Sequence, residues 1–140
     1  MRTFILVVTV ILGLGFSGFG QTDQPIIGSL SEIRGLTKYY VEANTVDRDK
    51  IRKELKSVSQ FEPVNDPSEA QFFVAYKTIS ERTGGSIPYS IATGQMDVYF
   101  LRDGKKVLAW SASGSAGGYK AAVAGKLSGQ FKKAFKKQFP

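Results

Sequence analysis

Any catalysis by this chain would have to use carboxylates, serines and lysines, because its 140 residues include no histidine and no cysteine. Without histidine there is no common general base near neutral pH, no Ser-His-Asp triad and no histidine zinc site. Without cysteine there are no thiol nucleophiles, thiolate metal sites or disulfides. Paired carboxylates, a Ser-Lys pair and arginine electrostatics remain as chemical options.

The residues that remain for catalysis form no recognisable pattern. Asp97 and Glu42 lie on different predicted strands, and nothing in the sequence brings them together. Asp47 and Asp49 lie where carboxylates stabilise the first turn of a helix. The serines near Lys106 lack the spacing of a Ser-Lys hydrolase. We therefore expect a protein that is not an enzyme, with no catalytic residue, no cofactor and no metal.

Positive charge is concentrated in the last quarter of the chain. The sequence has 19 Lys and Arg against 12 Asp and Glu, which gives a net charge of +7. Eight lysines and no acidic residue follow Asp103, so the 11 basic and 12 acidic residues before that point nearly balance. Such an asymmetry is typical of proteins that bind an anionic partner.

The segment from residue 119 to about residue 138 predicts an amphipathic helix with an apolar face and a lysine face. The candidate anion-binding residues are the lysines of this helix, Lys126, Lys132, Lys133, Lys136 and Lys137. Either the apolar face packs on a sheet, or the helix lies in the interface of an anionic membrane. We favour packing, because the sheet needs a second covering helix. Exposed lysines of a packed helix still attract anionic lipid or polysaccharide.

A predicted β-hairpin determines where several aromatic side chains lie. Residues 96–102 and 105–113 are rich in β-forming residues, and Asp103-Gly104 between them is a typical two-residue hairpin turn. Such a turn fixes the register of the two strands. The predicted pairs on one face are Leu101 with Lys106, Tyr99 with Leu108 and Asp97 with Trp110. Those on the other face are Phe100 with Val107, Val98 with Ala109 and Met96 with Ser111.

Tyr99, Leu108 and Trp110 are expected to project from the side of the sheet that faces away from the helices. Other aromatic side chains join them according to strand phase, Phe72 or Phe73 and Tyr39 or Tyr40. A two-layer protein leaves that face uncovered, and exposed Trp and Tyr commonly anchor protein interfaces. These three residues are therefore our candidate partner-binding site. The alternatives are that the N-terminal arm or the Gly84-Gly85 loop covers this face, or that the two sides are inverted.

RNA-binding sheets also carry aromatic side chains. Because this sequence lacks their pattern of glycine and aromatic residues on the central strands, we do not expect the protein to bind nucleic acid.

The remaining segments complete an α+β domain. Residues 37–43 and 71–79 predict strands, residues 45–58 predict a helix between them, and residues 81–94 predict a long loop. Residues 61–64 form either a short strand or an irregular connection. Because a helix follows the strand at 37–43, this strand should pair parallel with a neighbour through a right-handed crossover. We expect a two-layer α+β sandwich with a mostly antiparallel sheet of about four to five strands and two helices on one face.

The start of the chain predicts a secretory signal peptide. Arg2 precedes an uncharged apolar run of about ten residues, and a membrane-spanning helix needs about 20. Gly18 and Gly20 suit the −3 and −1 positions of signal peptidase, which places the cut before Gln21. An uncleaved membrane anchor is the alternative. The expected organisation is a signal peptide at 1–20, an extended N-terminal arm at 21–35 and a single α+β domain at 36–140, in the periplasm or outside the cell.

The order of the segments also supports a resemblance. After the signal peptide come "IIGSLSEIRGLTKYYVEA" (26–43), "RDKIRKEL" (48–55), "DPSEAQFFVAYKT" (66–78), "GQMDVYFLRDGKKVLAWSAS" (94–113) and the lysine-rich helix. In this order they resemble a group of small, uncharacterised exported bacterial proteins and, more distantly, the α/β domains of envelope accessory lipoproteins. The chain departs from lipoproteins because it lacks the lipid-bearing cysteine. The resemblance implies a bacterial source and a non-enzymatic role, and it carries over no functional residue.

The function predicted from the sequence is that of an exported, non-catalytic binding or accessory module of the bacterial cell envelope. Its expected partner is another envelope or extracellular protein, bound through the aromatic face of the sheet. The alternative is a peripheral binder of anionic lipid or polysaccharide that uses the lysine-rich C-terminal helix.

Overall fold

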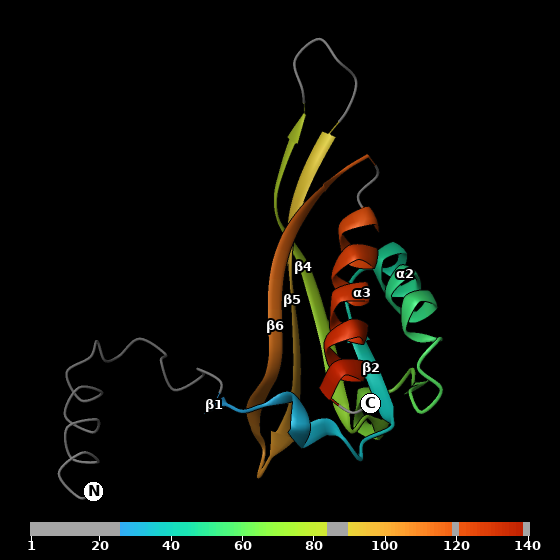
Figure 1. Ribbon diagram of the computed structural model, residues 1–140, viewed down its shortest axis with the longest axis vertical. Coiled ribbons are helices and arrows are strands. Elements are labelled where there is room, and N and C mark those ends of the chain that lie inside the picture. Colours follow the sequence, from blue (N-terminus) through green and yellow to red (C-terminus); the bar gives the residue numbers. More distant parts are fainter. Residues whose placement is uncertain (1–25, 84–89, 119–120, 139–140) are drawn as a thin grey trace, which may run out of the picture.

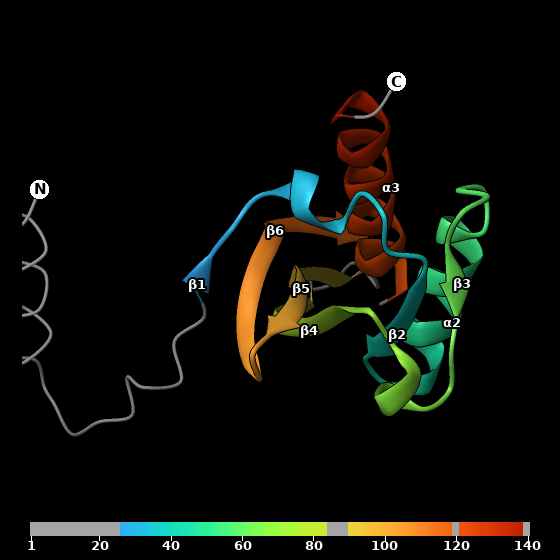
Figure 2. The ribbon, with the colours of Figure 1, turned by 90° about the horizontal axis from the view of Figure 1, so that it is seen from below.

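The computed structural model describes residues 26–83, 90–118 and 121–138. The predicted signal peptide therefore lies outside the described residues, as does the first part of the predicted arm. The elements in chain order are β1 (Ile26–Ile27), η2 (Leu30–Ile33), β2 (Lys38–Glu42), α2 (Thr45–Leu55), β3 (Glu62–Pro63), η3 (Pro67–Glu69), β4 (Phe72–Thr83), β5 (Ser90–Arg102), β6 (Lys105–Gly117) and α3 (Ala121–Gln138). They form a two-layer protein in which α2 and α3 lie side by side on one face of the sheet (Figures 1 and 2).

The six strands form one mixed sheet in the order β1-β6-β5-β4-β2-β3. β4, β5 and β6 are an antiparallel meander, whereas β2 pairs parallel with β4 and β3, and β1 pairs parallel with β6. The predicted α+β class, the two layers and the parallel pairing of the first predicted strand are confirmed. The sheet has six strands where four to five were predicted. The possible strand at 61–64 is present as β3, whereas β1 has only two residues and leaves no alternating pattern.

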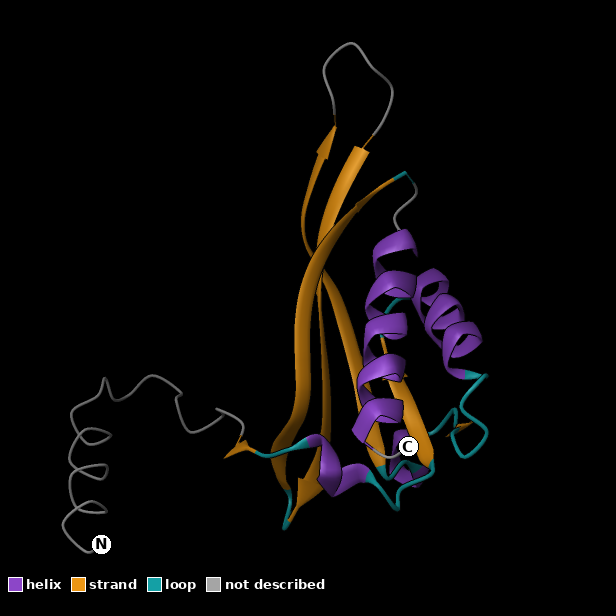
Figure 3. Ribbon diagram, viewed as in Figure 1, coloured by secondary structure: helices purple, strands orange, loops and turns teal. Residues whose placement is uncertain are grey.

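The long strands extend further than the sequence pattern predicts. β4 continues to Thr83 and β5 begins at Ser90, so much of the loop predicted at 81–94 is paired strand. This part of the hairpin projects beyond the ends of both helices (Figure 3). Its residues are mostly polar or small, and main-chain pairing holds them in a ladder without an apolar face. The sequence did not predict this pairing, because the composition of the segment is typical of turns.

The helix α2 begins at a side-chain cap and covers the parallel part of the sheet. The Oδ1 atom of Asn44 accepts a hydrogen bond from the backbone N–H of Asp47 at 2.9 Å, and Asn44 Nδ2 donates to Asp47 Oδ2 at 2.7 Å. These bonds satisfy orphan groups of the first turn and place a carboxylate at the positive end of the helix dipole. Ile51 and Leu55, one turn apart, are fully buried.

The helix α3 packs its apolar face on the sheet, as the favoured sequence interpretation requires. Its buried apolar residues are Ala121, Val123, Ala124, Leu127, Phe131 and Phe135. The ring of Phe61, which follows α2, lies parallel to that of Phe131 with centroids 6.0 Å apart, and 4.9 Å from the centroid of Phe135. The phenylalanines of the described part of α3 are therefore core residues, and this face is not available to insert into a membrane.

A β-bulge changes the register of the β5–β6 hairpin. Near the turn the predicted pairs are present, including Tyr99 with Leu108. Ala109 is then an extra residue on β6, so that Val98 pairs with Trp110. Beyond the bulge the pairs are Asp97 with Ser111 and Met96 with Ala112. The predicted pairs of Val98 with Ala109, Met96 with Ser111 and Asp97 with Trp110 are therefore wrong.

The bulge turns Trp110 to the helix side of the sheet. Because side chains alternate between faces along a strand, one extra residue moves every later side chain to the opposite face. The indole of Trp110 packs against the core, with its ring centroid 5.3 Å from that of Phe131. The prediction that Trp110 projects from the uncovered face with Tyr99 and Leu108 is wrong for this reason.

We expect Trp110→Ala to lower the free energy of unfolding by about 2 kcal/mol, because a half-buried ring leaves a gap beside Phe131. Trp110 is the single tryptophan of the chain, so urea unfolding should be followed by far-ultraviolet circular dichroism. Leu101→Ala is the matched control and should cost less than about 0.5 kcal/mol, since half of this side chain is exposed. Equal losses in the two variants would contradict the placement of Trp110.

Candidate functional site

The face of the sheet opposite the helices carries a row of apolar and aromatic side chains. Directly paired positions of neighbouring strands place their side chains on the same face. The register therefore aligns one residue from each of five strands, Tyr40 of β2, Phe73 of β4, Tyr99 of β5, Leu108 of β6 and Ile27 of β1. We call these five residues the sheet-face row. Two of the three predicted partner-binding residues, Tyr99 and Leu108, belong to it, and Trp110 does not.

The centre of the sheet-face row is closely packed. The rings of Phe73 and Tyr99 are stacked with centroids 5.0 Å apart, and Tyr40 meets Phe73 edge-on at 6.4 Å. The Nζ atom of Lys106 lies 4.5 Å from the centroid of the Tyr99 ring. Only 8% of Phe73 and 6% of Tyr99 are exposed. These two rings therefore support the surface from below and contribute little of the area that a partner could contact.

The exposed apolar area lies on the β6 side of the row. Ile27 is 75% exposed, Leu108 is half-buried, and Leu101, which pairs with Lys106 beside the row, is 51% exposed. The sequence pattern identified Leu108, but not Ile27, because a two-residue strand gives no alternation. Leu101 could have been identified from the sequence, because it lies two residues after Tyr99 on the same predicted strand and so faces the same side of the sheet.

A partly buried hydrogen bond fixes the tyrosine at the centre of the row. The Tyr99 hydroxyl donates to Glu42 Oε1 at 2.8 Å, across two strand spacings. Burial, followed by this bond to a carboxylate, raises the pKa of Tyr99 well above its usual value. The hydroxyl is therefore a fixed, neutral donor at physiological pH, and the aromatic base is rigid.

The carboxylates considered for catalysis share this face but are each engaged by a neighbour. Glu42 and Asp97 are aligned through Ala75, which lies between them on β4. Two strand spacings separate their main chains by about 10 Å. Asp97 Oδ1 accepts from Ser111 Oγ at 2.6 Å and from Gln95 Nε2 at 3.1 Å. The geometry gives these carboxylates structural partners and shows no arrangement that would activate one of them.

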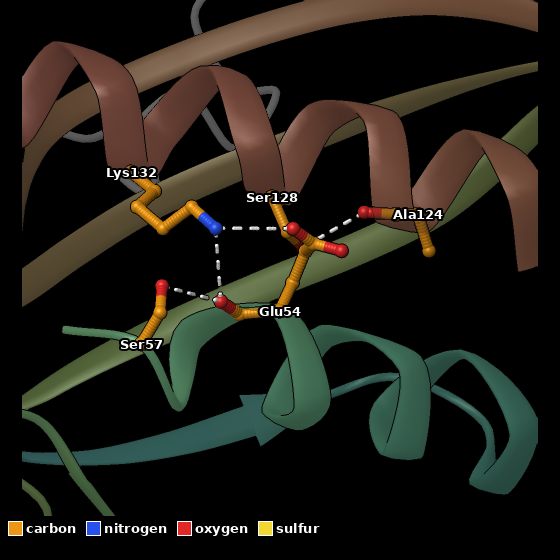
Figure 4. A network of polar contacts seen from close by, with 5 residues as sticks. All are labelled: Glu54, Ser57, Ala124, Ser128 and Lys132. Carbon is orange, nitrogen blue, oxygen red and sulfur yellow. Dashed lines mark hydrogen bonds and ion pairs between the residues drawn. The ribbon is translucent and has the colours of Figure 1, made fainter.

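The five candidate lysines of α3 do not act as one surface. Lys132 lies between the helices, where its Nζ is 3.1 Å from Glu54 Oε1 and 3.4 Å from the Glu54 carbonyl oxygen (Figure 4). Lys126 Nζ donates to the Ser115 carbonyl oxygen of β6 at 2.9 Å. Lys133, Lys136 and Lys137 are exposed. Three lysines therefore remain solvated, one joins the helices, and one reaches the edge of the sheet.

A basic pocket of about 400 Å³ lies between α2 and the β2–β3 edge of the sheet. Its lining residues are Tyr39, Asp49, Arg52, Lys53, Lys56, Phe61 and Pro63. Arg52 Nη2 is held by the Val64 carbonyl oxygen at 3.0 Å and by Asn65 Oδ1 at 3.1 Å. Burial raises the pKa of Tyr39 to about 12, although the nearby Arg52 opposes this shift. The sequence showed the basic residues of α2, but not that they meet an apolar floor.

The described residues were also compared with the requirements of a metal site and of a membrane-spanning helix. No three potential metal-ligating side chains gather into a cluster anywhere in residues 26–83, 90–118 and 121–138. Within the same residues, neither helix is both long and apolar enough to cross a bilayer.

Comparison with known proteins identifies similar folds but no family. No protein-family model and no curated protein matches the chain. Among solved structures, a PelC dodecamer from Paraburkholderia phytofirmans is 16% identical, with a TM-score of 0.51 over 77% of this chain and 88% of PelC. A minor lipoprotein from Acinetobacter baumannii is 15% identical, with a TM-score of 0.47 over 74% of this chain and 92% of that protein. Uncharacterized lipoprotein B from Nitrosomonas europaea is 10% identical, with a TM-score of 0.43 over 89% and 97%.

These neighbours agree with the resemblance found in the sequence. They include uncharacterised bacterial proteins and lipoproteins, the two groups that the order of segments resembles. At 16% identity the likeness to PelC shows the fold alone. No residue of the sheet-face row or of the lysine set is therefore assigned a role from these proteins.

We expect Lys132→Ala to lower the free energy of unfolding by about 1 kcal/mol, because Lys132 binds a carboxylate and a carbonyl at the C-terminal end of α2. Both side chains of this pair are partly solvated, which keeps the loss small. Lys136→Ala removes an exposed lysine of the same helix and should change stability by less than about 0.5 kcal/mol. Urea unfolding curves measure both values. If the two variants were equally stable, Lys132 would be a solvated lysine like Lys136.

Proposed function

We propose that this protein is an exported, non-catalytic accessory module of the bacterial cell envelope that binds another protein through the sheet-face row. One observation carries the proposal: the row crosses five strands on a face that no described helix covers. Uncovered apolar area of this kind commonly marks an interface.

The chemistry of the row favours a protein over a small ligand. Its base is rigid, because the Phe73 and Tyr99 rings stack and the Tyr99 hydroxyl is bonded to Glu42. Its exposed part is apolar, and Lys106 and Glu42 provide polar groups at its margin. An apolar centre with a polar rim is the usual anatomy of a protein interface.

The placement in the envelope rests on the sequence. The charged start, the short apolar run and the small residues before Gln21 are those of a secretory signal peptide. The PelC structures are dodecamers, so a further copy of this chain is one candidate protein partner. Light scattering of the purified protein over a range of concentrations distinguishes a second copy from a different protein.

The alternative function uses the lysines of α3 to bind an anionic surface. The exposed side chains of Lys133, Lys136 and Lys137 support it. The buried apolar face of the same helix limits it to electrostatic attraction, without insertion. A few exposed lysines give binding that salt screens strongly.

We expect a photo-crosslinking amino acid at Leu101 to form an adduct with a single protein in the native host. The reason is that Leu101 is exposed beside the sheet-face row. The matched control is the same amino acid at Lys53, an exposed position of α2 on the helix side. Adducts are separated by gel electrophoresis and identified by mass spectrometry.

A second substitution tests whether the adduct depends on the sheet-face row. Leu108→Glu places a charge in the half-buried part of the row and should reduce the Leu101 adduct at least tenfold in otherwise folded protein. The proposal fails if Leu101 and Lys53 give the same adducts, or if Leu108→Glu leaves the Leu101 adduct unchanged.

We expect the protein not to sediment with vesicles of anionic phospholipid at about 0.15 M salt, because three solvated lysines give too little attraction at this ionic strength. The measurement is co-sedimentation over a range of salt concentrations. Sedimentation at about 0.15 M salt that the combined change of Lys133, Lys136 and Lys137→Glu abolishes would support the alternative function instead.

A further inference from the structure

The outer edge of β6 is covered over only a short part of its length. β6 has 13 residues, and its outer neighbour β1 pairs only with Val107 and Leu108. Gly28 donates its N–H to the Leu108 carbonyl oxygen at 2.8 Å, and η2 follows from Leu30. From Ser111 to Gly117, β6 therefore has no strand on its outer side within the described part of the chain. An unpaired edge of this length is a template for another strand.

Two hydrogen bonds show which backbone groups of β6 point outward. The Leu108 carbonyl oxygen accepts from Gly28, and the Ser115 carbonyl oxygen accepts from Lys126 Nζ at 2.9 Å. Alternate residues of an antiparallel strand direct their N–H and C=O groups to the same side. The bulge at Ala109 shifts this alternation by one residue between Leu108 and Ser115, so the outward groups beyond the bulge are those of Ser111, Ser113 and Ser115. No other described element of the protein bonds to them.

A stripe of lysines runs beside this edge. α3 follows β6 and lies along it (Figure 1), and Lys126 already reaches Ser115. At 100° per residue, Lys133 and Lys137 lie within about 20° of Lys126 around the helix axis. All three are exposed. We call these three residues the lysine stripe; Lys132, which binds Glu54, points away from it.

The charge of the stripe decides what kind of strand the edge can accept. A second copy of this chain would bring the same edge and the same lysines, and no acidic residue follows Asp103 to compensate them. Like charges directly opposite one another destabilise a pairing. An acidic strand has the opposite charge and gains from every lysine of the stripe.

We propose that the β6 edge binds an extended, acidic segment of a partner protein by β-strand addition. Its main chain pairs with the outward groups of Ser111, Ser113 and Ser115, and carboxylates at alternate positions of the segment meet Lys126 and Lys133. Lys126 leaves the Ser115 carbonyl oxygen to the incoming strand. Main-chain bonds supply the attraction and the lysines supply the selectivity, as in other strand-addition modules.

The side chains around the edge explain why charge is the selective element. From Ser111 to Gly117 the strand alternates serine with alanine or glycine, so it has no pocket for a large side chain. Gly114 leaves room for Leu127 of α3, because a Cβ atom there would lie 3.3 Å from Leu127 Cδ2. This edge therefore carries small side chains on the face opposite the helices, whereas Leu127 and Lys126 of α3 lie against its other face. This edge is separate from the sheet-face row, so the inference goes beyond the proposed function.

The test uses the full mature chain and a fluorescein-labelled peptide of alternating glutamate and threonine, about ten residues long. Fluorescence anisotropy should show saturable binding with a Kd of about 10–100 μM at low salt. Ser113→Pro removes one outward N–H without breaking a bond to β5, and should weaken binding about tenfold. The double change Lys126→Glu and Lys133→Glu should weaken it by at least as much.

Matched controls separate strand addition from simple charge attraction. Ser113→Ala removes the hydroxyl but keeps the N–H and should bind as the wild type does. Lys136→Glu makes the same charge change off the stripe and should have less than a threefold effect. A peptide with proline in place of threonine cannot form the ladder and should not bind. The amides of Ser111 and Ser113 should exchange with deuterium more slowly when the glutamate–threonine peptide is present.

The outcomes either support or overturn the proposal. Binding that Ser113→Pro does not weaken, in protein that circular dichroism shows to be folded, would leave only charge attraction and overturn it. If Ser113→Pro does not fold, amide exchange of the wild type decides, and unchanged Ser111 and Ser113 amides overturn it. Absence of saturable binding up to about 1 mM peptide also overturns it.

A second copy of the chain is the competing occupant of the edge. A concentration-dependent dimer that the Lys126→Glu and Lys133→Glu change strengthens would therefore also overturn the proposal. Leu108→Glu changes the sheet-face row alone, and unchanged peptide binding in this variant keeps the two proposals distinguishable.

Discussion

The contact of Phe131 with the sheet is the interaction on which the rest of this structure depends. Phe131 is fully buried between Phe61, which follows α2, and Trp110 on β6. It thereby joins the two helices and the antiparallel part of the sheet in one core. Aromatic contacts of this kind bury large areas and favour particular ring geometries, so they fix the rotation of a helix as well as its position. Because both helices are held on one face, no helix in the described part of the chain covers the opposite face of the sheet.

The rotation of α3 gives each of its lysines a different environment. Lys132 points toward α2, where the Glu54 carboxylate and carbonyl oxygens accept its hydrogen bonds, whereas Lys126 points toward β6 and the Ser115 carbonyl oxygen. A helix turned by 100° about its axis would break these bonds, because each lysine would then point in another direction. The packing that buries Phe131 therefore also determines which lysines of α3 are bonded to the protein and which face solvent. One lysine stabilises the helix pair, and a stripe of three lies along the sheet edge.

Local signals in the sequence predicted much of this fold. The cap at Asn44, the apolar spacing of α2 and α3 and the Asp103-Gly104 turn all act within a few residues, so they were readable from the chain. The pairing of Tyr99 with Leu108 followed from the turn. The bulge at Ala109 did not, because it depends on the fit of Trp110 against Phe131, which lies more than 20 residues away in the sequence. β1 was missed because two residues leave no period. The division of the lysines was missed because it depends on the rotation of α3.

The bulge also connects the two surfaces proposed for binding. Ahead of it, Tyr99 and Leu108 face away from the helices and belong to the apolar row; beyond it, the same face of β6 carries only serines. Had the strand continued without an extra residue, Trp110 would extend the apolar row along β6, and small residues would face Phe131 in its place. The bulge thus limits the apolar contact area that β6 contributes to one end of the strand and leaves an edge of small residues at the other. In the proposed binding Trp110 acts only through this division, because the ring that packs against α3 is removed from the surface that a partner would meet.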